Sequence, residues 1–182
     1  MSRVSGASLM SFQLFLQRDH GEGAYEAVLG HMPAAMAEPL RGIVLPVNWY
    51  PTVSFVRAIE TAHGQLGSDD LYERYGSFAA EFQINTFQKL LLRFTSPAYM
   101  LNRAGKVWHR FHETGDWNVS AATGKTMRGE LHNFSVVSSG YCRVLRAWIL
   151  RAGQMTGAEG GVDHPECRAK GAAVCVFTGW WK

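Results

Sequence analysis

Three cysteines and one histidine near the C-terminus are the residues whose types and spacing could most clearly do chemistry. Cys167 and Cys175 lie equally far from Gly171 along the chain. If two strands form a hairpin that turns at Gly171, the cysteines face each other with Cβ atoms about 4.5 to 5.5 Å apart. Two thiolates at that spacing can bind one zinc ion, and the same geometry also permits a disulfide at some strain.

Two further side chains could complete a tetrahedral site. His164 lies three residues before Cys167, which in a regular strand places it on the opposite face, but Pro165 interrupts the ladder and allows a bend. Cys142 opens a predicted helix, where the backbone dipole stabilises a thiolate. We therefore predict a structural zinc bound by Cys142, His164, Cys167 and Cys175. The alternative is that the cysteines are buried thiols, because free cysteine is among the most buried residue types.

The length and composition of the chain indicate what kind of protein positions these residues. The chain has 182 residues, of which 47% are hydrophobic and 18% charged, so residues 1–182 are expected to form a single domain. The net charge of +3 comes from scattered basic residues, which argues against nucleic-acid binding. No apolar run is long enough to span a bilayer and no signal peptide is recognisable, so we expect a cytoplasmic protein.

Hydrophobic spacing predicts helices in the first part of the chain. One helix begins near Tyr50, after which Pro51 occupies a favoured first position. Another is expected to stop or bend at Gly76 or before Ser96-Pro97. The predicted ranges are Ala7 to Asp19, which could begin as a strand, then Gly21 to Met36, Val47 to His63 and Ser68 to Phe94.

The second part of the chain changes to alternating patterns that are typical of strands. The predicted strands are Val107 to His112, Trp117 to Ala122, Thr126 to Phe134, Val162 to Ala169 and Val174 to Trp181. A helix at Val137 to Met155 precedes the last two strands. The fold class is therefore α+β, with N-terminal helices packed on a C-terminal antiparallel sheet of about five strands.

Aromatic residues from these elements could line an apolar ligand pocket, since ligand sites are mostly apolar with a few polar anchors. The predicted ligand-binding residues are Trp49, Phe78, Phe82, Trp108, Phe134, Tyr141 and Trp148. His132 and Arg143, with Tyr141, are the candidate polar anchors. Each aromatic residue taken singly is more often part of a core than of a binding site.

Two histidines, His109 and His112, suggest a haem or metal site, but residues three apart in a strand face opposite sides and do not share one ion easily. Exposed histidines at a sheet edge are the simpler interpretation. No hydrolase turn, HExxH, phosphate loop or dinucleotide fingerprint is present, so we expect no enzyme activity.

The segment from Cys167 to Phe177, with His164 before it and tryptophans at its end, resembles the C-terminal motif of the hydrocarbon-binding (4-vinyl reductase) domain superfamily. Trp49-Tyr50-Pro51, Ser96-Pro97 and Tyr141-Cys142 extend the likeness along the chain. The resemblance implies a TRAPP-like fold, a dimer formed through helices, and zinc held by three cysteines and a glutamate. His164 stands where that motif has the glutamate, and Glu166 is a second possible oxygen donor.

Three hypotheses follow. The first is a sensory or carrier domain that binds a small hydrophobic or aromatic molecule, with a structural zinc in the C-terminal hairpin and output through a homodimer or a separate signalling partner. The second is an interaction or scaffold subunit with a filled core and an exposed helix face that includes Trp49 or Phe55. The third is a haem-linked sensor that uses His109 or His112.

Overall fold

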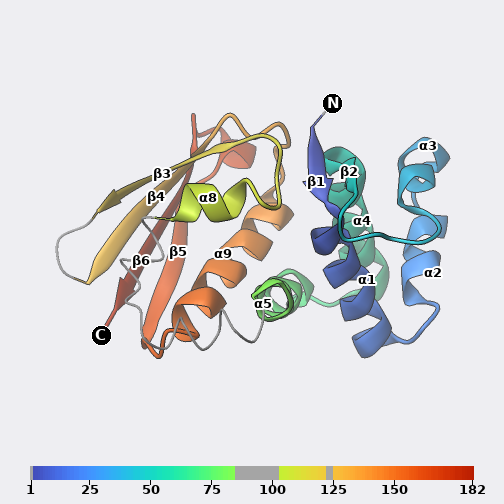
Figure 1. Cartoon of the computed structure of the whole chain (residues 1–182), viewed down its shortest axis with the longest axis horizontal. Coiled ribbons are helices and arrows are strands. Elements are labelled where there is room, and N and C mark those ends of the chain that lie inside the picture. Colours follow the sequence, from blue (N-terminus) through green and yellow to red (C-terminus); the bar gives the residue numbers. More distant parts are fainter. Residues whose placement is uncertain (1, 85–102, 122–124) are drawn as a thin grey trace.

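Two closely packed helices, α5 (Leu71–Gln83) and α9 (Ser139–Gln154), connect the helical and sheet-containing parts of the molecule (Figure 1). The computed structural model describes residues 2–84, 103–121 and 125–182. Glycines allow the close approach of these helices. A Cβ atom on Gly76 would lie 2.3 Å from the carbonyl oxygen of Val144, and one on Gly140 would lie 2.6 Å from the ring of Tyr72.

The N-terminal half consists of helices around an apolar core. They are α1 (Gly6–His20), α2 (Ala24–Gly30), α3 (Ala34–Ala37), the 3-10 turn η1 (Glu38–Leu40) and α4 (Thr52–Leu66). Leu9, Phe12 and Leu16 recur at helical spacing on α1 and are fully buried. Two short strands, β1 (Arg3–Ser5) and β2 (Trp49–Pro51), pair antiparallel beside these helices.

The C-terminal half contains a four-stranded antiparallel sheet with the strand order β3-β4-β6-β5. The strands are β3 (Asp116–Ala121), β4 (Thr126–His132), β5 (Gly160–Glu166) and β6 (Cys175–Trp181). Helix α9 packs against β5, and the short helix α8 (Ala104–Trp108) contacts β3 (Figure 1). The seam between the helices and this sheet is where buried aromatic side chains from both halves meet.

The prediction of an α+β fold is confirmed, but the predicted sheet differs from the observed one. The expected strand at Val107 to His112 is instead the end of α8 and the turn after it. The His112 amide donates to the Trp108 carbonyl at 2.9 Å, and the Trp108 indole donates to the Thr114 carbonyl at 2.9 Å. These contacts override the strand preference of the local aromatic and β-branched residues.

The helix predicted at Gly21 to Met36 is instead two short helices, α2 and α3, because Pro33 interrupts the segment and begins the second helix. The other predicted elements agree with the structure within a few residues, except where the range extends beyond the described part. The helix predicted at Ser68 to Phe94 corresponds to α5, while residues 85–94 and the Ser96-Pro97 break lie outside the described residues. Helix α5 continues through Gly76 without a break. The pairing of β1 with β2 was not predicted.

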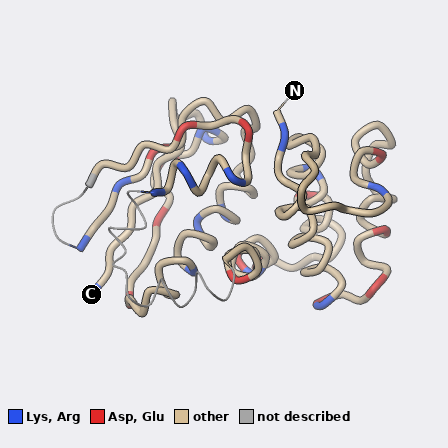
Figure 2. The backbone as a smooth tube through the Cα atoms, in the orientation of Figure 1, with Lys and Arg blue, Asp and Glu red and all other residues tan. Residues whose placement is uncertain are grey.

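Charged side chains are scattered along the chain and are not gathered on one element (Figure 2). Several form ion pairs, such as Arg143 with Glu73 at 2.8 Å and Arg151 with Glu81 at 2.6 Å. Within the described residues, no helix combines the length and apolar character needed to cross a membrane.

Candidate functional site

A cavity of about 170 Å³, partly open to solvent, lies between α5, α8, α9 and the sheet. None of its described lining residues is Asp, Glu, Lys or Arg, and most are apolar. An apolar cavity of about 150 Å³ is large enough to take up benzene or xenon, so this one can hold a single small ring. Residues that line it include Phe55, Tyr75, Trp108, Val144 and Trp148.

Two polar side chains of the cavity wall, His112 and Tyr141, form a buried hydrogen-bonded pair. Their Nε2 and Oη atoms are 2.6 Å apart, and the two residues are 6% and 5% exposed. The imidazole stacks on Trp108, with ring centroids 3.7 Å apart, and meets Phe134 edge to face. Burial among these rings lowers the pKa of His112 to about 3, so the imidazole is neutral at physiological pH.

The second ring nitrogen of His112, Nδ1, is buried and lies against the backbone of Trp108. A neutral histidine and a tyrosine carry two polar protons between them, and their mutual hydrogen bond uses one. If Tyr141 donates, the Nδ1 proton of His112 remains; if His112 donates, the hydroxyl proton of Tyr141 remains. In the first of these tautomers, the Nδ1 proton lies beside the backbone of Trp108, whose hydrogen bond acts to raise the pKa of His112.

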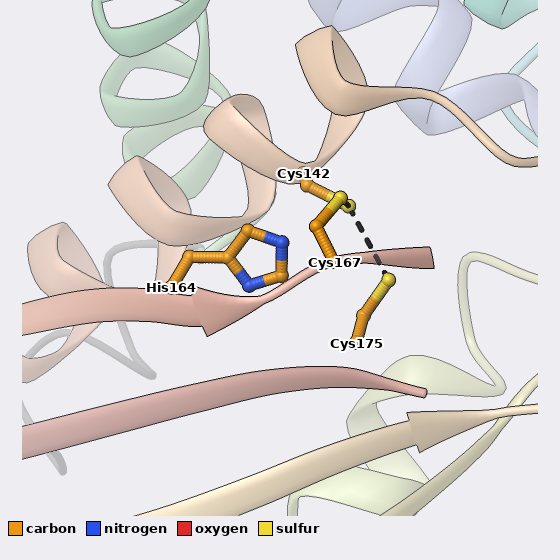
Figure 3. A group of neighbouring side chains, drawn as sticks. All are labelled: Cys142, His164, Cys167 and Cys175. Atoms are coloured by element: carbon orange, nitrogen blue, oxygen red, sulfur yellow. Dashed lines mark hydrogen bonds between the residues drawn. The ribbon is translucent and has the colours of Figure 1, made fainter. Parts of the chain in front are cut away.

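A second cluster lies where the C-terminal hairpin meets the first turn of α9 (Figure 3). Its ligand-type atoms, three sulfurs and one imidazole nitrogen, all lie within 4.8 Å of one another. Cys142 Sγ is 3.6 Å from Cys175 Sγ and 3.9 Å from Cys167 Sγ, and all three thiols are free and buried. His164 reaches the cluster from β5.

The hairpin turns at Gly171, as the sequence predicted. Gly171 adopts a left-handed conformation with φ of 92° and reverses the chain. The ladder between β5 and β6 ends at the pair Glu166 and Val176, one step before the two cysteines. The register is interrupted between Asp163 and Glu166, around Pro165, which leaves the His164 Nδ1 atom 2.8 Å from the Val176 carbonyl.

The electrostatics of the cluster favour one shared negative charge. The hydrogen bond from Cys142 lowers the pKa of the Cys175 thiol, with further stabilisation from His164 and from the Arg168 amide at 3.4 Å. The same contact raises the pKa of Cys142. Burial lowers the pKa of His164, but hydrogen bonding to Cys175 and Cys167 outweighs it and raises that pKa to about 9. The cluster can thus hold a thiolate beside an imidazolium.

The structure brings three of the seven predicted ligand-binding residues, Trp108, Tyr141 and Trp148, to the cavity. Phe134 is buried behind it and contacts the rings of Trp108 and Tyr141. The other three lie elsewhere: Phe78 stacks with Phe82 on α5, and Trp49 is 41% exposed on β2.

The two other candidate anchors are engaged away from the cavity. His132 lies 3.0 Å from a carboxylate oxygen of Glu130, and Arg143 pairs with Glu73. His109 is exposed, as expected, but His112 is buried and not an edge residue. Helical spacing between Trp108 and His112 was the signal that could have identified the buried histidine.

Comparison with known proteins identifies a shared fold. No protein-family model matches the sequence, and no curated protein matches it. An H-NOX (haem-nitric oxide/oxygen binding) protein from S. oneidensis, solved in the Fe(II)NO state, superposes with a TM-score of 0.76 at 13% identity, covering 98% of this chain and 99% of that one. The unliganded Fe(II) H-NOX protein from K. algicida superposes with a TM-score of 0.73 at 12% identity, covering 98% of this chain and 96% of that chain.

An oxygen-binding H-NOX domain related to soluble guanylate cyclases, solved as its oxygen complex, gives a TM-score of 0.68 at 12% identity and covers 98% of this chain and 95% of that chain. The alignments extend over nearly the whole of each chain. This protein therefore has the fold of H-NOX domains.

These comparisons correct three sequence-based predictions. The resemblance to the hydrocarbon-binding superfamily and the TRAPP-like fold that it implied are wrong, because a hairpin motif of eleven residues, Cys167 to Phe177, is local and does not determine how the helices pack. Structural zinc as the cofactor is also wrong, because the solved domains with this fold are haem domains. The convergence of the four side chains is observed, and their role as metal ligands stays a prediction.

Proposed function

We propose that this chain is a sensory domain that binds a small molecule in the cavity between its helices and its sheet. The observation that carries the proposal is the partly open, mostly apolar cavity with the buried polar pair His112 and Tyr141 in its wall. A fold whose solved examples include complexes with nitric oxide and oxygen supports a sensory role. The scaffold hypothesis called for a filled core and an exposed face that includes Trp49 or Phe55. Trp49 is 41% exposed and Phe55 is 1% exposed, and the cavity argues against a filled core.

Haem is the group that the fold implies, and it makes a haem-linked sensor a stronger alternative than a zinc-stabilised hydrocarbon carrier. The described residues do not fit haem in this arrangement. A cavity of about 170 Å³ suits a single ring, whereas a porphyrin contains four pyrrole rings. The described lining offers no Lys or Arg to pair with propionates, and the Nε2 atom of His112 is already bonded to Tyr141.

A haem titration separates the two possibilities. Haemin is added to the purified protein, and the absorbance spectrum is compared between the wild type and His112→Ala. We expect no Soret band that depends on His112. Binding of one haem per chain, with a Soret band that is lost in His112→Ala, would contradict direct ligand binding in the cavity and support a haem-linked sensor.

Ligand binding itself can be tested by filling the cavity. Val107 lines the cavity from α8 and is partly exposed, so Val107→Phe places a ring there without crowding a closed core. Val53→Phe, at an exposed position on α4 outside the cavity, is the matched control. Small apolar molecules should raise the melting temperature of the wild type and of Val53→Phe but not that of Val107→Phe. Equal shifts in all three proteins would exclude the cavity as the site.

The proposal includes no catalytic step, and the domain acts by binding alone. Output through a homodimer or through a separate signalling partner stays a prediction, as does a cytoplasmic location.

A further inference from the structure

We propose that Cys142 and Cys175 are a modification site, at which a small peroxide oxidises the two thiols to a reversible intramolecular disulfide. The inference goes beyond the proposed function, because it concerns the cluster at the C-terminal hairpin and not the cavity. All three cysteines of this cluster are free thiols. The sulfur of Cys142 lies 3.6 Å from that of Cys175, closer than the 3.9 Å that separates it from the sulfur of Cys167 (Figure 3).

The two sulfur atoms come from elements that are distant in the sequence. Cys142 lies in the first turn of α9, and Cys175 begins β6. A disulfide has an S–S distance of about 2.05 Å, so the sulfurs must approach each other by about 1.5 Å. Since β6 is hydrogen-bonded to strands on both sides, we expect this approach to come from the first turn of α9, which also carries Tyr141 of the cavity wall.

Cys175 is the thiol whose surroundings favour attack on an oxidant. The nucleophile in thiol chemistry is the thiolate, which hydrogen-bond donors and positive charge stabilise. The Arg168 amide donates to Cys175 Sγ at 3.4 Å, and an imidazole nitrogen of His164 lies within 4.8 Å of the same sulfur. Cys142 is in direct contact with Cys175, in the position of a thiol that can convert an oxidised cysteine to a disulfide.

The oxidation takes place in two balanced steps. The Cys175 thiolate attacks one oxygen of hydrogen peroxide, the O–O bond breaks, and a sulfenic acid and hydroxide form. The Cys142 sulfur then attacks the sulfenic sulfur, the S–O bond breaks, and the thiol proton leaves with the hydroxyl group as water. The two sulfurs lose two electrons in total, and the peroxide gains them.

Burial limits the oxidant to a small molecule. Cys142 and Cys175 are each 6% exposed, so a bulky reagent cannot reach the sulfurs while the protein is folded. The cluster nevertheless lies close under the surface, because Glu166 and Lys170 of the same hairpin are exposed. Hydrogen peroxide, with only two heavy atoms, is therefore the probe that suits this site.

The test treats the reduced wild-type protein, as purified, with hydrogen peroxide and then blocks the remaining thiols with an alkylating agent in denaturant. We expect the intact mass to fall by two hydrogen atoms, one of the three cysteines to stay open to alkylation, and peptide mapping to link Cys142 to Cys175. Dithiothreitol should restore all three thiols. A different linkage, an irreversible sulfinic acid or an unchanged thiol content would overturn the proposal.

Variants that remove one or two thiols distinguish the two roles. Cys167→Ser keeps the proposed pair and is the matched control, so it should form the disulfide as the wild type does. Cys142→Ser/Cys167→Ser leaves Cys175 alone, and its sulfenic acid should be captured by dimedone, a reagent specific for this group. Cys167→Ser/Cys175→Ser leaves Cys142 alone, and capture should be largely lost. Equal capture in the two double variants would overturn the role of Cys175, and the wild-type linkage decides the proposal even where a double variant does not fold.

Discussion

The Nε2 atom of His112 and the phenolic oxygen of Tyr141 lie 2.6 Å apart, and this buried contact connects the turn after α8 to the first turn of α9. In the sequence, β3 and β4 lie between these two elements. The pair therefore holds these two elements together at the cavity wall.

Tyr141→Phe tests the structural role of this contact. The substitution removes the hydroxyl and leaves His112 without a hydrogen-bonded side chain in a buried environment, so we expect the free energy of unfolding to fall by about 1–3 kcal/mol. Tyr72→Phe is the control, because Tyr72 is also buried but its hydroxyl forms no hydrogen bond among the described residues. In denaturant unfolding, the free energy of unfolding of the control should differ from that of the wild type by less than about 0.5 kcal/mol. Equal losses in the two variants would contradict a specific role for the pair.

The low pKa of His112 predicts a loss of stability in acid. The folded-state pKa is about 3 and the ordinary value is 6.5, so the unfolded chain binds a proton in this range and the folded protein does not. Stability from this group is therefore complete above pH 6.5 and falls by about 1.4 kcal/mol per pH unit as the pH decreases toward 3. In His112→Asn this contribution is absent. The free energy of unfolding, measured between pH 7 and pH 5, should therefore depend less steeply on pH in the variant than in the wild type.

Carboxylates also titrate in acid, but they do so in both proteins and cancel in the difference between the slopes. Parallel pH profiles for the wild type and His112→Asn would show that the imidazole is not held neutral by burial.

The sequence predicted the thiol cluster better than the cavity. The arrangement of Cys167 and Cys175 follows from the symmetry of a hairpin about Gly171, which is a local property. The cavity depends on how α4, α5 and α9 pack, and residues such as Phe55 and Tyr75 are indistinguishable in sequence from ordinary core residues.

The region from Val107 to His112 shows why local pattern failed. Its alternating side chains suit a strand, and this extra strand accounts for the prediction of about five strands where the sheet has four. Packing of Trp108 against Phe134 and Trp117 instead stabilises a helical turn, which brings His112 into the core. Contacts between distant segments decided the conformation, and such contacts are not encoded in a short window.

Gly76→Ala tests the close packing of α5 against α9. The new methyl carbon would lie 2.3 Å from the Val144 carbonyl oxygen and 2.8 Å from the Ala147 Cβ atom, so the helices must separate. We expect a loss of about 1–3 kcal/mol of stability, as for other overpacked cores. Gly64→Ala is the matched control: Gly64 is an exposed helical glycine with no atom within 4 Å of the added carbon. Thermal unfolding should show the control slightly stabilised, because alanine favours helix by about 0.5–1 kcal/mol.

Ser138→Ala tests how the sequence fixes the start of α9, the turn that carries both Tyr141 and Cys142. The Ser138 hydroxyl accepts a hydrogen bond from the Tyr141 amide at 3.1 Å and donates one to Glu60 on α4 at 2.6 Å. Loss of this cap should cost about 1–2 kcal/mol and increase hydrogen exchange in the first turn of α9. Ser139→Ala, at the exposed next position, should change neither, since Ser139 makes no such cap. Faster exchange of the Tyr141 amide, with no matching change at the C-terminal end of α9, would show that the cap acts locally on the turn that carries Tyr141 and Cys142. Unchanged exchange of the Tyr141 amide would contradict the capping role.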